Sequence, residues 1–577
     1  MTAVDPISKL LAQEEIPVPH ESIHQGSFLL DMLLEQQQDL TAVERFSNLH
    51  ESGDIPDQAQ YYRKLMPANP PGPGQQYAFD VDLDSCSGCK ACVTACHTLN
   101  GLDEDETWRD VGMMCGGTSQ QPAMQHVTTA CHHCVEPACM IACPVDAYVK
   151  DEVTGIVKHL DDQCIGCKYC TLACPYEVPK YNHKKGIVRK CDMCTTRLSN
   201  DEAPACVQAC PHEAIRIQII DIDQVSEDAE ASPFLPATPD PQITLPTTTY
   251  RTKKIFPRNF LPADYFNVSP QSPHWPLVIM LVLTQLSVGG FVAGLSLEFA
   301  LPVELWEIMR PFHATGALLF GLLALSSSVF HLGRPLYAFR AVLGLRHSWL
   351  SREILAFGIF AKLAIVYALC VHFLGSTEYV WIEVLNILAW MVSATGLIAL
   401  FCSAMIYIFT RKEFWSPVQT GVKFTLTTAV LGVASVWLSL LVLSTVQSSE
   451  SIDALLSQAG PVCGKLLIIF SVLKLGWEAS LFTHLLSRQM TSLKRSAMLM
   501  TRQLSSFTMA RFAAGLLGGI MMPAFLLQNP STAGEPITVQ FFISVVILVI
   551  ACIVGELLER YLFFAAVASP RMPGGIR

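Results

Sequence analysis

The sequence predicts two parts of different structural class: a small α+β domain rich in cysteine, followed by an all-α bundle that crosses a membrane eight times. The chain of 577 residues holds 21 cysteines, and most of them lie before residue 211. Hydrophobic residues make up 51% of the chain and charged residues 15%, which is more apolar than is typical of soluble proteins. The apolar excess is local, because long apolar runs begin only after Pro276.

Changes in composition predict the domain boundaries. An N-terminal extension of residues 1–76 contains an amphipathic helical pattern within residues 20–50 and ends in a Pro/Gly-rich break. The first sixteen residues have no basic start, apolar core or twin arginine, so we expect no signal peptide. The cysteine-rich domain, a proline-rich linker expected to be extended, and the membrane domain follow at residues 77–221, 222–273 and 274–577.

Sixteen cysteines form four consecutive quartets. Three quartets end in Cys-x3-Cys-Pro, and the third has the spacing of bacterial ferredoxins, in which three close thiolates bind one iron–sulfur cluster and the fourth reaches another. Structural zinc does not require this repeated ending, and a disulfide framework is typical of small secreted chains. We therefore expect iron–sulfur ligation. The quartets are Cys86, Cys89, Cys92 and Cys96; Cys131, Cys134, Cys139 and Cys143; Cys164, Cys167, Cys170 and Cys174; and Cys191, Cys194, Cys206 and Cys210.

Short secondary-structure elements are expected between the quartets. Residues 147–150 and 156–159 predict a β-hairpin, and residues 215–220 predict a further strand. Cys115 has no partner spacing, so it is expected to be structural. Because the free energy of metal binding is also folding free energy, the domain should be largely unfolded without its clusters.

Residues 77–221 resemble the four-cluster iron–sulfur subunit of the dimethyl sulfoxide reductase family of molybdenum enzymes, and the match covers all sixteen cysteines. The resemblance implies that the outer quartets interleave with each other, as do the inner two, and that four 4Fe-4S clusters are bound. The implied ligand sets are Cys86, Cys89, Cys92 and Cys210; Cys96, Cys191, Cys194 and Cys206; Cys131, Cys134, Cys139 and Cys174; and Cys143, Cys164, Cys167 and Cys170.

Eight apolar runs in the second half predict membrane spans, most of them with the twenty or so residues that cross the hydrocarbon layer. The seventh is short and has Arg511 at its edge. The predicted spans are Pro276–Leu297, Pro311–Phe330, Ile354–Leu374, Val384–Thr410, Phe424–Gln447, Leu466–Leu486, Phe512–Gln528 and Ile537–Gly555.

The distribution of basic residues predicts the orientation. Segments on the side of the cluster domain carry 19 lysines and arginines, whereas the opposite side has only Arg310 and Lys465. By the positive-inside rule, we expect the cluster domain on the cytoplasmic face of the cytoplasmic membrane. This differs from the best-known members of the resembled family, whose cluster subunit lies outside that membrane. The net charge of −11 argues against a nucleic-acid partner.

The membrane half resembles the eight-helix quinol-oxidising anchor of the same reductases, which is haem-free. The resemblance implies a quinol site that uses His331 and Glu353. We expect a menaquinol-type quinol and no haem, since His313, His331, His372 and His484 show no paired spacing. The matching stretches are His274-Trp275-Pro276, His331-Leu332-Gly333-Arg334-Pro335, Ser351-Arg352-Glu353-Ile354 and Gly555-Glu556-Leu557-Leu558-Glu559-Arg560.

Quinol oxidation explains why a histidine and a carboxylate would be needed at those positions. Oxidation of a hydroquinone releases two protons, and a histidine and a membrane-shielded carboxylate are suited to accept them. Arg334 and Arg352 could hold Glu353 ionised or orient the quinol head group. The alternative interpretation is that all four are ordinary interfacial polar residues at helix ends.

Charged residues inside the spans form a separate feature. Lys474 and Glu478 stand four residues apart on one helix face, and Lys362 is isolated in the third span. Charges at such depth are expensive and mark function by default. An internal ion pair is the favoured interpretation of Lys474 and Glu478, and a proton path is the alternative.

No P-loop, Rossmann glycine motif or molybdopterin domain is present, so the chain is expected to transfer electrons for a reaction completed elsewhere. We expect a non-catalytic electron-transfer and anchor subunit with its own quinol site, which passes electrons to a separate molybdopterin-containing subunit. The alternatives are dehydrogenase-to-quinone transfer, a quinone-coupled proton translocator and a passive anchor.

Overall fold

The computed structural model describes residues 34, 59–231, 234–373, 379–446, 449–528 and 539–574. The amphipathic pattern within residues 20–50 lies outside the described residues, apart from Leu34. The chain forms two compact units, Met1–Tyr61 and Tyr62–Arg577, and the second unit contains both the cysteine-rich domain and the membrane helices.

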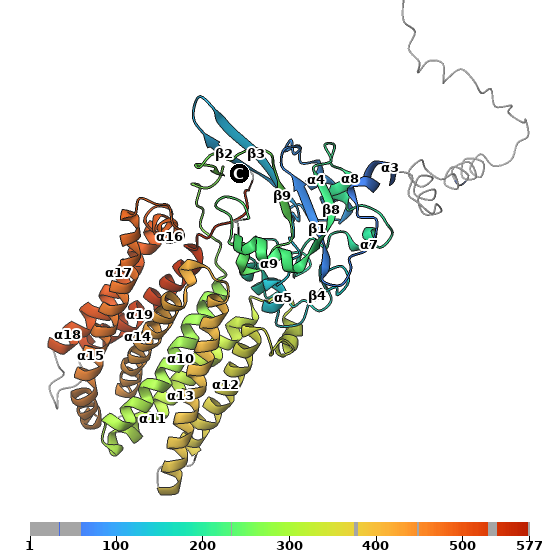
Figure 1. Cartoon of the computed structure of the whole chain (residues 1–577). Coiled ribbons are helices and arrows are strands. Elements are labelled where there is room, and N and C mark those ends of the chain that lie inside the picture. Colours follow the sequence, from blue (N-terminus) through green and yellow to red (C-terminus); the bar gives the residue numbers. More distant parts are fainter. Residues whose placement is uncertain are drawn as a thin grey trace, which may run out of the picture. The chain divides into compact units, whose positions relative to one another are not determined.

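The cysteine-rich domain is built on a three-stranded sheet. Its central strand β1 (Gln75–Asp82) pairs antiparallel with β8 (Ile215–Asp221) and parallel with β9 (Thr249–Arg251) (Figure 1). The strand predicted at residues 215–220 is therefore confirmed as β8. Because β1 and β8 come from opposite ends of the domain, their pairing closes it and brings the first and last quartets together.

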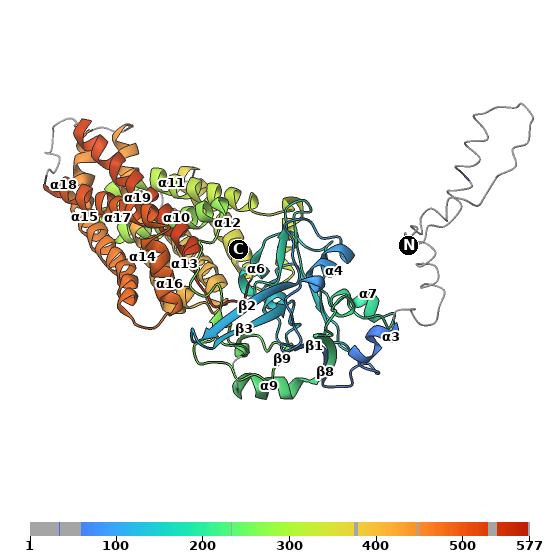
Figure 2. The same cartoon turned by 90° about the horizontal axis from the view of Figure 1, so that it is seen from above.

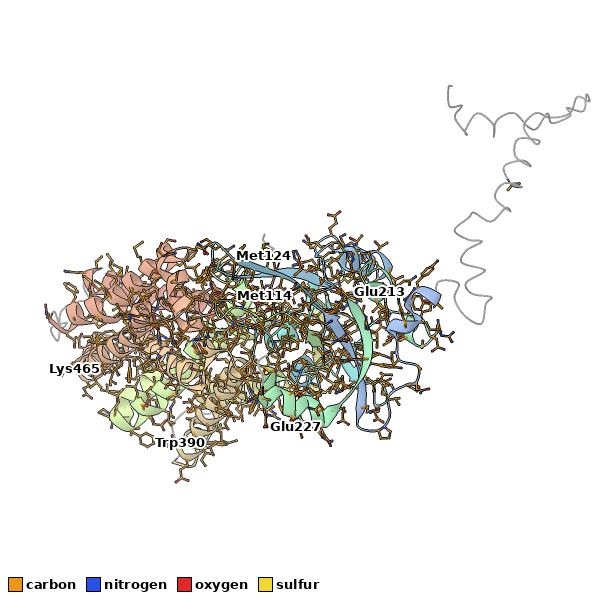
Figure 3. The ribbon with its side chains drawn as sticks, turned by 45° about the horizontal axis from the view of Figure 1, so that its top comes forward. Met114, Met124, Glu213, Glu227, Trp390 and Lys465 are labelled. Carbon is orange, nitrogen blue, oxygen red and sulfur yellow. The ribbon has the colours of Figure 1, made fainter. Side chains whose placement is uncertain are left out.

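Three further antiparallel hairpins carry the rest of the domain. Strands β2 (Asp110–Gly117) and β3 (Pro122–Thr129) form a long ribbon that β10 (Leu261–Pro262) extends (Figure 2). Its two faces differ: Met114 is fully buried, whereas Met124 is 60% exposed (Figure 3). The predicted hairpin is confirmed as β4 (Tyr148–Lys150) and β5 (Val157–His159).

Short helices follow the cysteine motifs. The turn before two of them is tight: Lys90 and Lys168 precede α4 and α6 with φ of 63° and 61°, which turns the chain sharply after a Cys-x2-Cys pair. The remaining strands are β6 (Lys180–Asn182) and β7 (Ile187–Arg189). The short helices are α4 (Ala91–Leu99), α5 (Ala138–Ala142), α6 (Tyr169–Ala173), α7 (Thr195–Leu198) and α8 (Ala205–Gln208).

The proline-rich segment expected to be an extended linker is more ordered than its composition predicts. It begins with helix α9 (Ile222–Ala231) and contributes β9 and β10 to the two sheets. Thr247 and Thr248 are buried, and their hydroxyls bond the backbone oxygen and Nδ1 of His132. These contacts hold the segment against the cluster domain before it reaches the membrane half.

All eight predicted membrane spans are confirmed as long apolar helices. The seventh is longer than predicted, because it begins at Ser505 and contains a π-helical turn, so Arg511 lies inside it and not at its edge. The spans are α10 (Trp275–Ala300), α11 (Val303–Val329), α12 (Trp349–Phe373), α13 (Tyr379–Ile408), α14 (Pro417–Ser444), α15 (Ser449–Ser480), α17 to α18 (Ser505–Gln528) and α19 (Val539–Ala565).

Helices α10 and α14 form the centre of the bundle. They are the two most buried spans, and α10 packs against α11, α13, α14 and α19 (Figure 1). Glycines permit the closest approach, because a Cβ at Gly289 would lie 2.2 Å from Thr428 O. Small residues at a helix crossing are the usual way to bring backbones together in a membrane.

The chain returns to the cluster domain after the last span. Met572 is buried with Met114 and Val127 of the β2–β3 ribbon. A Cβ at Gly112 would lie 2.0 Å from Pro573 O, so the tail runs directly over strand β2. The membrane half is therefore joined to the cluster domain at both of its ends.

Candidate iron–sulfur and quinol sites

The sulfur atoms of the sixteen cysteines gather in four groups, and each group joins cysteines from two quartets. The family resemblance implies the same four sets as iron ligands, and that assignment stays a prediction. The first and third groups each line one small pocket, and electrostatic interactions link the members of the second and fourth. In order, the groups are Cys86, Cys89, Cys92 and Cys210; Cys96, Cys191, Cys194 and Cys206; Cys131, Cys134, Cys139 and Cys174; and Cys143, Cys164, Cys167 and Cys170. We refer to them as the first to fourth groups.

Contacts between groups give their order in space. Cys92 of the first group interacts with Cys206 of the second, and Cys131 of the third interacts with Cys191 of the second. Tyr148 interacts with sulfur atoms of the third and fourth groups. The first group lies at the outer end, where Cys89 is exposed. The four groups therefore form one continuous series.

Burial raises the pKa of several of these thiols and makes them poor acids. It raises the pKa of Cys96 to about 12 and the pKa of Cys143 to about 11. Since the thiolate is the metal-binding form, iron–sulfur ligation must displace protons that burial otherwise holds on sulfur. Binding of the cluster and folding of the domain are consequently coupled.

Buried donors beside the sulfur groups are consistent with bound clusters. Arg109 Nη2, Tyr148 Oη and His159 Nε2 are buried and have no hydrogen-bond partner. Each lies near a cysteine of one of the groups. Arg109 interacts with Cys206, Tyr148 with Cys170 and His159 with Cys164. Since hydrogen bonds to sulfur are usual around iron–sulfur clusters, these donors fit clusters bound at the four groups.

The membrane loop, residues 330–348 between α11 and α12, contacts the fourth group on one side. Gly333 N donates to Gly166 O over 3.4 Å, and Arg334 N donates to Ile165 O over 3.0 Å. A Cβ at Gly333 would lie 2.0 Å from Gly186 O, so only glycine fits this contact. The His331 to Pro335 motif therefore lies directly against the loop that carries Cys164 and Cys167.

The same loop holds the fourth group on its other side. Gly344 N donates to Pro144 O over 2.9 Å, and Ser348 Oγ donates to Ala142 O over 2.7 Å. Ser351 Oγ also donates to Pro144 O, at 3.3 Å. Pro144 follows Cys143 directly, so the membrane loop contacts both parts of the chain that supply this group.

A cavity of about 310 Å³ lies between the cluster domain and the membrane helices. Cys167, Lys168, His274 and His331 line it together with apolar side chains such as Trp415. Lys168 Nζ lies 3.3 Å from His274 Nε2 and 3.9 Å from the centre of the Tyr181 ring. Polar groups next to a cluster ligand, in a cavity that also has apolar walls, are compatible with a small-molecule site.

The hydrogen bonding of His331 leaves one ring nitrogen able to accept a proton in this cavity. Its Nδ1 bonds the backbone oxygen of Ser328, which only accepts, so Nδ1 carries the proton and Nε2 is the free acceptor. Burial lowers the pKa of His331 to about 4, and His274 and Lys168 act in the same direction. Burial and Lys168 also lower the pKa of His274. Both imidazoles are therefore neutral at pH 7.

The structure does not gather all four predicted quinol residues. Glu353 is buried at the start of α12, its Oε1 has no hydrogen-bond partner, and it does not line the cavity. Arg334 Nη1 donates to Asp161 O over 2.9 Å. Arg352 donates to Leu345 O over 3.1 Å and to Arg346 O over 2.6 Å, so it holds the loop. His274 and Lys168 line the cavity although sequence reasoning assigned them no role there.

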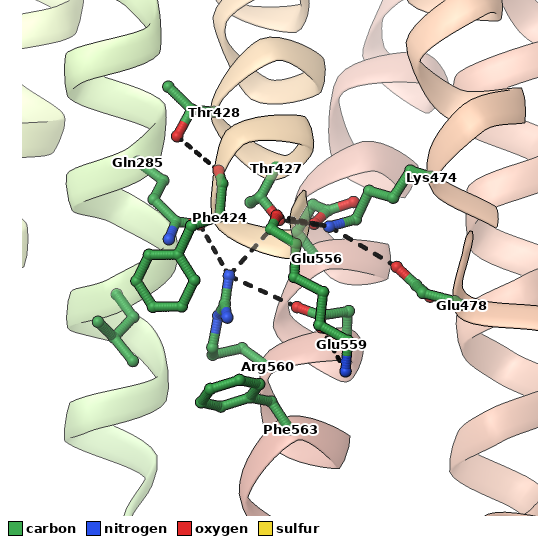
Figure 4. Close-up of polar contacts among 12 residues, drawn as sticks. Gln285, Phe424, Thr427, Thr428, Lys474, Glu478, Glu556, Glu559, Arg560 and Phe563 are labelled. Atoms are coloured by element: carbon green, nitrogen blue, oxygen red, sulfur yellow. Dashed lines mark hydrogen bonds and ion pairs between the residues drawn. The ribbon is translucent and has the colours of Figure 1, made fainter. Parts of the chain in front are cut away.

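A network of seven buried charges crosses the C-terminal half of the bundle, and the sequence indicated only part of it (Figure 4). The predicted Lys474–Glu478 pair is confirmed at 3.6 Å, but Lys474 lies closer to Glu556, at 3.0 Å. Arg511 contacts Glu478 at 2.9 Å and Glu556 at 3.0 Å. Helices α15, α17 and α19 therefore meet in one ionic cluster.

The rest of the network is less tightly paired. Lys423 lies 3.9 Å from Glu559, and Arg560 lies 3.5 Å from the same carboxylate and 2.9 Å from Gln285 Oε1. Lys423, Arg511 and Arg560 belong to the basic residues from which the orientation was predicted, yet all three lie inside helices. Lys362 is exposed on α12 and takes no part.

Fold and sites together define an iron–sulfur protein anchored by multiple membrane spans. Comparison with family models gives the same division: a model described as "4Fe-4S dicluster domain" matches residues 122–220, and "DMSO reductase anchor subunit (DmsC)" matches residues 270–566, just over half of the chain. The protein belongs to the DMSO reductase anchor family and carries the matching iron–sulfur subunit in the same polypeptide. It is an electron-transfer and membrane-anchor subunit of a molybdopterin oxidoreductase.

Similar proteins support the assignment of the N-terminal half. The B subunit of the anaerobic dimethyl sulfoxide reductase of Haemophilus influenzae is 34% identical over 189 residues, 31% of this chain and 91% of that protein. The B subunit of the Escherichia coli (strain K12) enzyme is 38% identical over 154 residues, 25% of this chain and 75% of that one. The thiosulfate reductase electron transfer subunit PhsB of Salmonella typhi is 35% identical over 153 residues, 26% and 79% respectively.

Proposed function

We propose that this chain oxidises a menaquinol-type quinol in the cavity beside His331 and passes the electrons through four 4Fe-4S clusters to a separate molybdopterin-containing subunit. The observation that carries the proposal is the cavity itself. It joins a neutral histidine base, a lysine and the cluster ligand Cys167 in one space, with both polar and apolar walls, between the cluster domain and the membrane helices. Its volume of about 310 Å³ lies at the lower end of the range of small-molecule pockets and suits a head group.

His331 accepts the first proton in this scheme. As a quinol hydroxyl loses an electron, its O–H bond breaks and the proton passes to Nε2 of His331. The Ser328 carbonyl keeps the opposite ring nitrogen protonated, so the imidazolium that forms remains hydrogen-bonded at that nitrogen. Lys168 bonds His274 and holds positive charge beside the cavity. The quinol loses two electrons and two protons in total.

Glu353 serves as the second protonatable group, from outside the cavity lining. It interacts electrostatically with Tyr169, whose hydroxyl donates to Ile406 O over 3.0 Å. Tyr169 follows the cavity residue Lys168 in the chain, so α6 connects the carboxylate with the cavity. Arg334 and Arg352 act as positioning residues, because their guanidinium groups are committed to backbone oxygens of the membrane loop and the cluster domain.

The four sulfur groups would each bind one 4Fe-4S cluster, which supplies one-electron transfer when bound. The fourth group receives electrons, because its ligand Cys167 lines the cavity. The first group delivers them, because Cys89 is exposed and Cys86 and Cys210 are partly exposed. The molybdopterin-containing partner would bind over that end.

The cluster domain and the partner would lie on the cytoplasmic side of the cytoplasmic membrane. Of the basic residues counted toward this side, only Lys423, Arg511 and Arg560 belong to the buried network. Those that remain still exceed Arg310 and Lys465 on the other side by a wide margin, and Arg310 itself is paired with Glu298 at 2.9 Å. The positive-inside rule therefore gives the same orientation after this correction.

The quinol site is tested by EPR on membranes that contain the full chain. In the wild type, menaquinol should reduce the clusters, whereas His331→Gln should lose that reduction and still be reduced by dithionite. The matched control is His372→Gln, an exposed histidine at the far end of α12, which should behave as the wild type. Equal menaquinol-driven reduction in His331→Gln and the control would reject the site.

A further inference from the structure

Two buried cations in the cluster domain have no carboxylate partner. Arg109 is 3% exposed and Lys190 is 2% exposed. Among the described residues neither forms an ion pair with Asp or Glu, although Arg189, next to Lys190, contacts Glu106 at 3.1 Å. A buried charge without a counter-ion costs several kcal/mol, so the negative partner of these cations must come from the cysteine groups.

Arg109 lies between the first and second groups. It stands just before β2, and its Nη1 donates to Thr128 Oγ1 over 3.1 Å. The same hydroxyl lies 3.6 Å from Cys92 Sγ of the first group. The nearest charged neighbours of the guanidinium are Cys206 of the second group and Cys92. Its Nη2 is buried without a partner and is free to face bound sulfur.

Lys190 lies between the second and third groups. Its Nζ donates to Cys131 Sγ of the third group over 3.5 Å and to the backbone oxygen of Cys191 in the second group over 2.9 Å. Val157 O accepts the third hydrogen bond of the ammonium. With all three donors in use, the ammonium is held in one position between the two groups.

The third junction in the series is uncharged. Tyr148 interacts with Cys139 of the third group and with Cys170 of the fourth, and its buried hydroxyl has no hydrogen-bond partner. The series therefore has a fixed positive charge at each of the two junctions remote from the membrane and a neutral hydroxyl at the junction next to the cavity.

We propose that Arg109 and Lys190 set the reduction potentials of the clusters, each raising the potentials of the two clusters that it separates. The second cluster adjoins both cations and is raised most. The physical reason is that an added electron is stabilised by a nearby positive charge, and more strongly in a protein interior than in water. The proposal rests on the four cluster sites proposed above.

This charge pattern has a consequence for electron transfer. Buried cations lie between the third and second groups and again between the second and first, beyond the fourth group at which electrons enter. They draw electrons away from the quinol cavity toward the second group. The arrangement favours transfer from the membrane into the series.

The experiment is an EPR-monitored redox titration of the full chain in membranes, driven by dithionite and mediators. Arg109→Gln should lower the midpoint potentials of the first and second clusters, and Lys190→Gln those of the second and third. The charge-retaining variants Arg109→Lys and Lys190→Arg should stay close to the wild type. The control Lys158→Gln removes a partly exposed lysine, whose ammonium lies 4.0 Å from Asp151, and should change nothing.

The double variant tests which clusters each cation acts on. In Arg109→Gln/Lys190→Gln the second cluster should shift by the sum of the two single shifts, and the fourth cluster should keep its potential. If a glutamine variant fails to load, iron content and EPR should show loss confined to the flanking pair, restored by the charge-retaining variant. Unchanged potentials, or changes outside the flanking pair, would overturn the proposal.

The titration separates this proposal from the proposed function. It needs neither quinol nor the molybdopterin-containing partner, so loss of the quinol site would leave its outcome unaffected. A wild-type spectrum with fewer than four clusters would reject the cluster sets. If four clusters are present and their midpoint potentials are the same in the wild type and both glutamine variants, only the role of Arg109 and Lys190 is rejected.

Discussion

The cluster domain and the membrane bundle both bury charge, but they compensate it in opposite ways. Among the described residues of the cluster domain, Arg109 and Lys190 form no ion pair with a carboxylate and lie beside cysteine groups. In the bundle, Lys474 and Arg511 share the carboxylates of Glu478 and Glu556. In the first region a bound, negatively charged cluster would supply the counter-charge, whereas in the second the counter-charge comes from carboxylates of the chain itself. A buried cation beside sulfur ligands is therefore read differently from one beside a carboxylate.

The membrane network itself has two parts. Around Lys474 and Arg511 the pairs are short and hydrogen-bonded. Around Arg560, both oxygens of Glu559 lack a hydrogen-bond partner, and the guanidinium lies over the Phe424 ring at 4.4 Å. The network is thus a tight four-residue cluster with a looser extension toward α10 and α14.

The largest expected effect is removal of iron. Chains produced under iron starvation should lose the fold of residues 77–221, because sixteen thiols without metal provide no substitute for the ligand bonds. Limited trypsin digestion should then cut the cluster domain and leave the membrane helices protected, since their charges are paired within the chain. If the apo cluster domain resisted trypsin as well as the iron-loaded domain, the contrast between the two regions would fail.

A large but local effect is expected from Glu556→Gln. Among the described residues, the variant leaves Glu478 as the only carboxylate in direct ion-pair contact with Lys474 and Arg511, which should lower the free energy of unfolding by about 3 kcal/mol. Denaturant unfolding in detergent, followed by tryptophan fluorescence, measures the loss. Lys362→Met removes an exposed lysine and should change stability by less than about 0.5 kcal/mol.

The double variant Lys474→Met/Glu556→Leu tests whether the network is self-compensating. It removes one cation and one carboxylate and leaves Arg511 paired with Glu478, so it should be less destabilised than Glu556→Gln. A double variant at least as unstable as the single one would show that the network does more than balance charge.

A moderate effect is expected where the two regions meet. Gly333→Ala places a methyl group 2.0 Å from Gly186 O and must shift the membrane loop from the fourth group. Menaquinol-driven cluster reduction should slow on the order of tenfold or more, while dithionite reduction is unchanged. Gly316→Ala on α11 has open space around the added carbon and serves as the control. Identical rates in both variants would mean that this contact does not position the cavity.

The smallest expected effect is the pH dependence that His331 contributes. Its pKa is about 4 in the folded protein, against 6.5 when unperturbed. Between these values the unfolded chain binds more protons, so the folded state loses stability as pH falls from about 6.5 to about 4 and is unaffected above 6.5. The difference in melting temperature between wild type and His331→Gln should therefore change only in that window. A difference that stays constant from pH 7 to 4 would contradict the buried neutral imidazole.

Sequence patterns predicted most of the fold because the signals are local. Eight apolar runs were enough for eight helices, and residues 147–159 carried their own turn. Sequence patterns were insufficient wherever interacting residues lie far apart in the chain. Lys474 and Glu478 are one helical turn apart, and their pairing was predicted. Arg511 and Glu556 reach this pair from other helices, and their part in the network was not predicted. The order within segment 222–273 was missed for the same reason, because its strands exist only as additions to β1 and β2.

The sequence by itself determined the chemistry of this protein: sixteen thiols at ferredoxin-like spacing select iron–sulfur ligation, and apolar length selects a membrane anchor, since both depend on residue type and local spacing. Only the tertiary structure decided which groups work together. It placed His331, His274 and Lys168 around one cavity, committed Arg334 and Arg352 to backbone oxygens, and set Arg109 and Lys190 between sulfur groups. Such convergence depends on long-range packing, which no short stretch of sequence records.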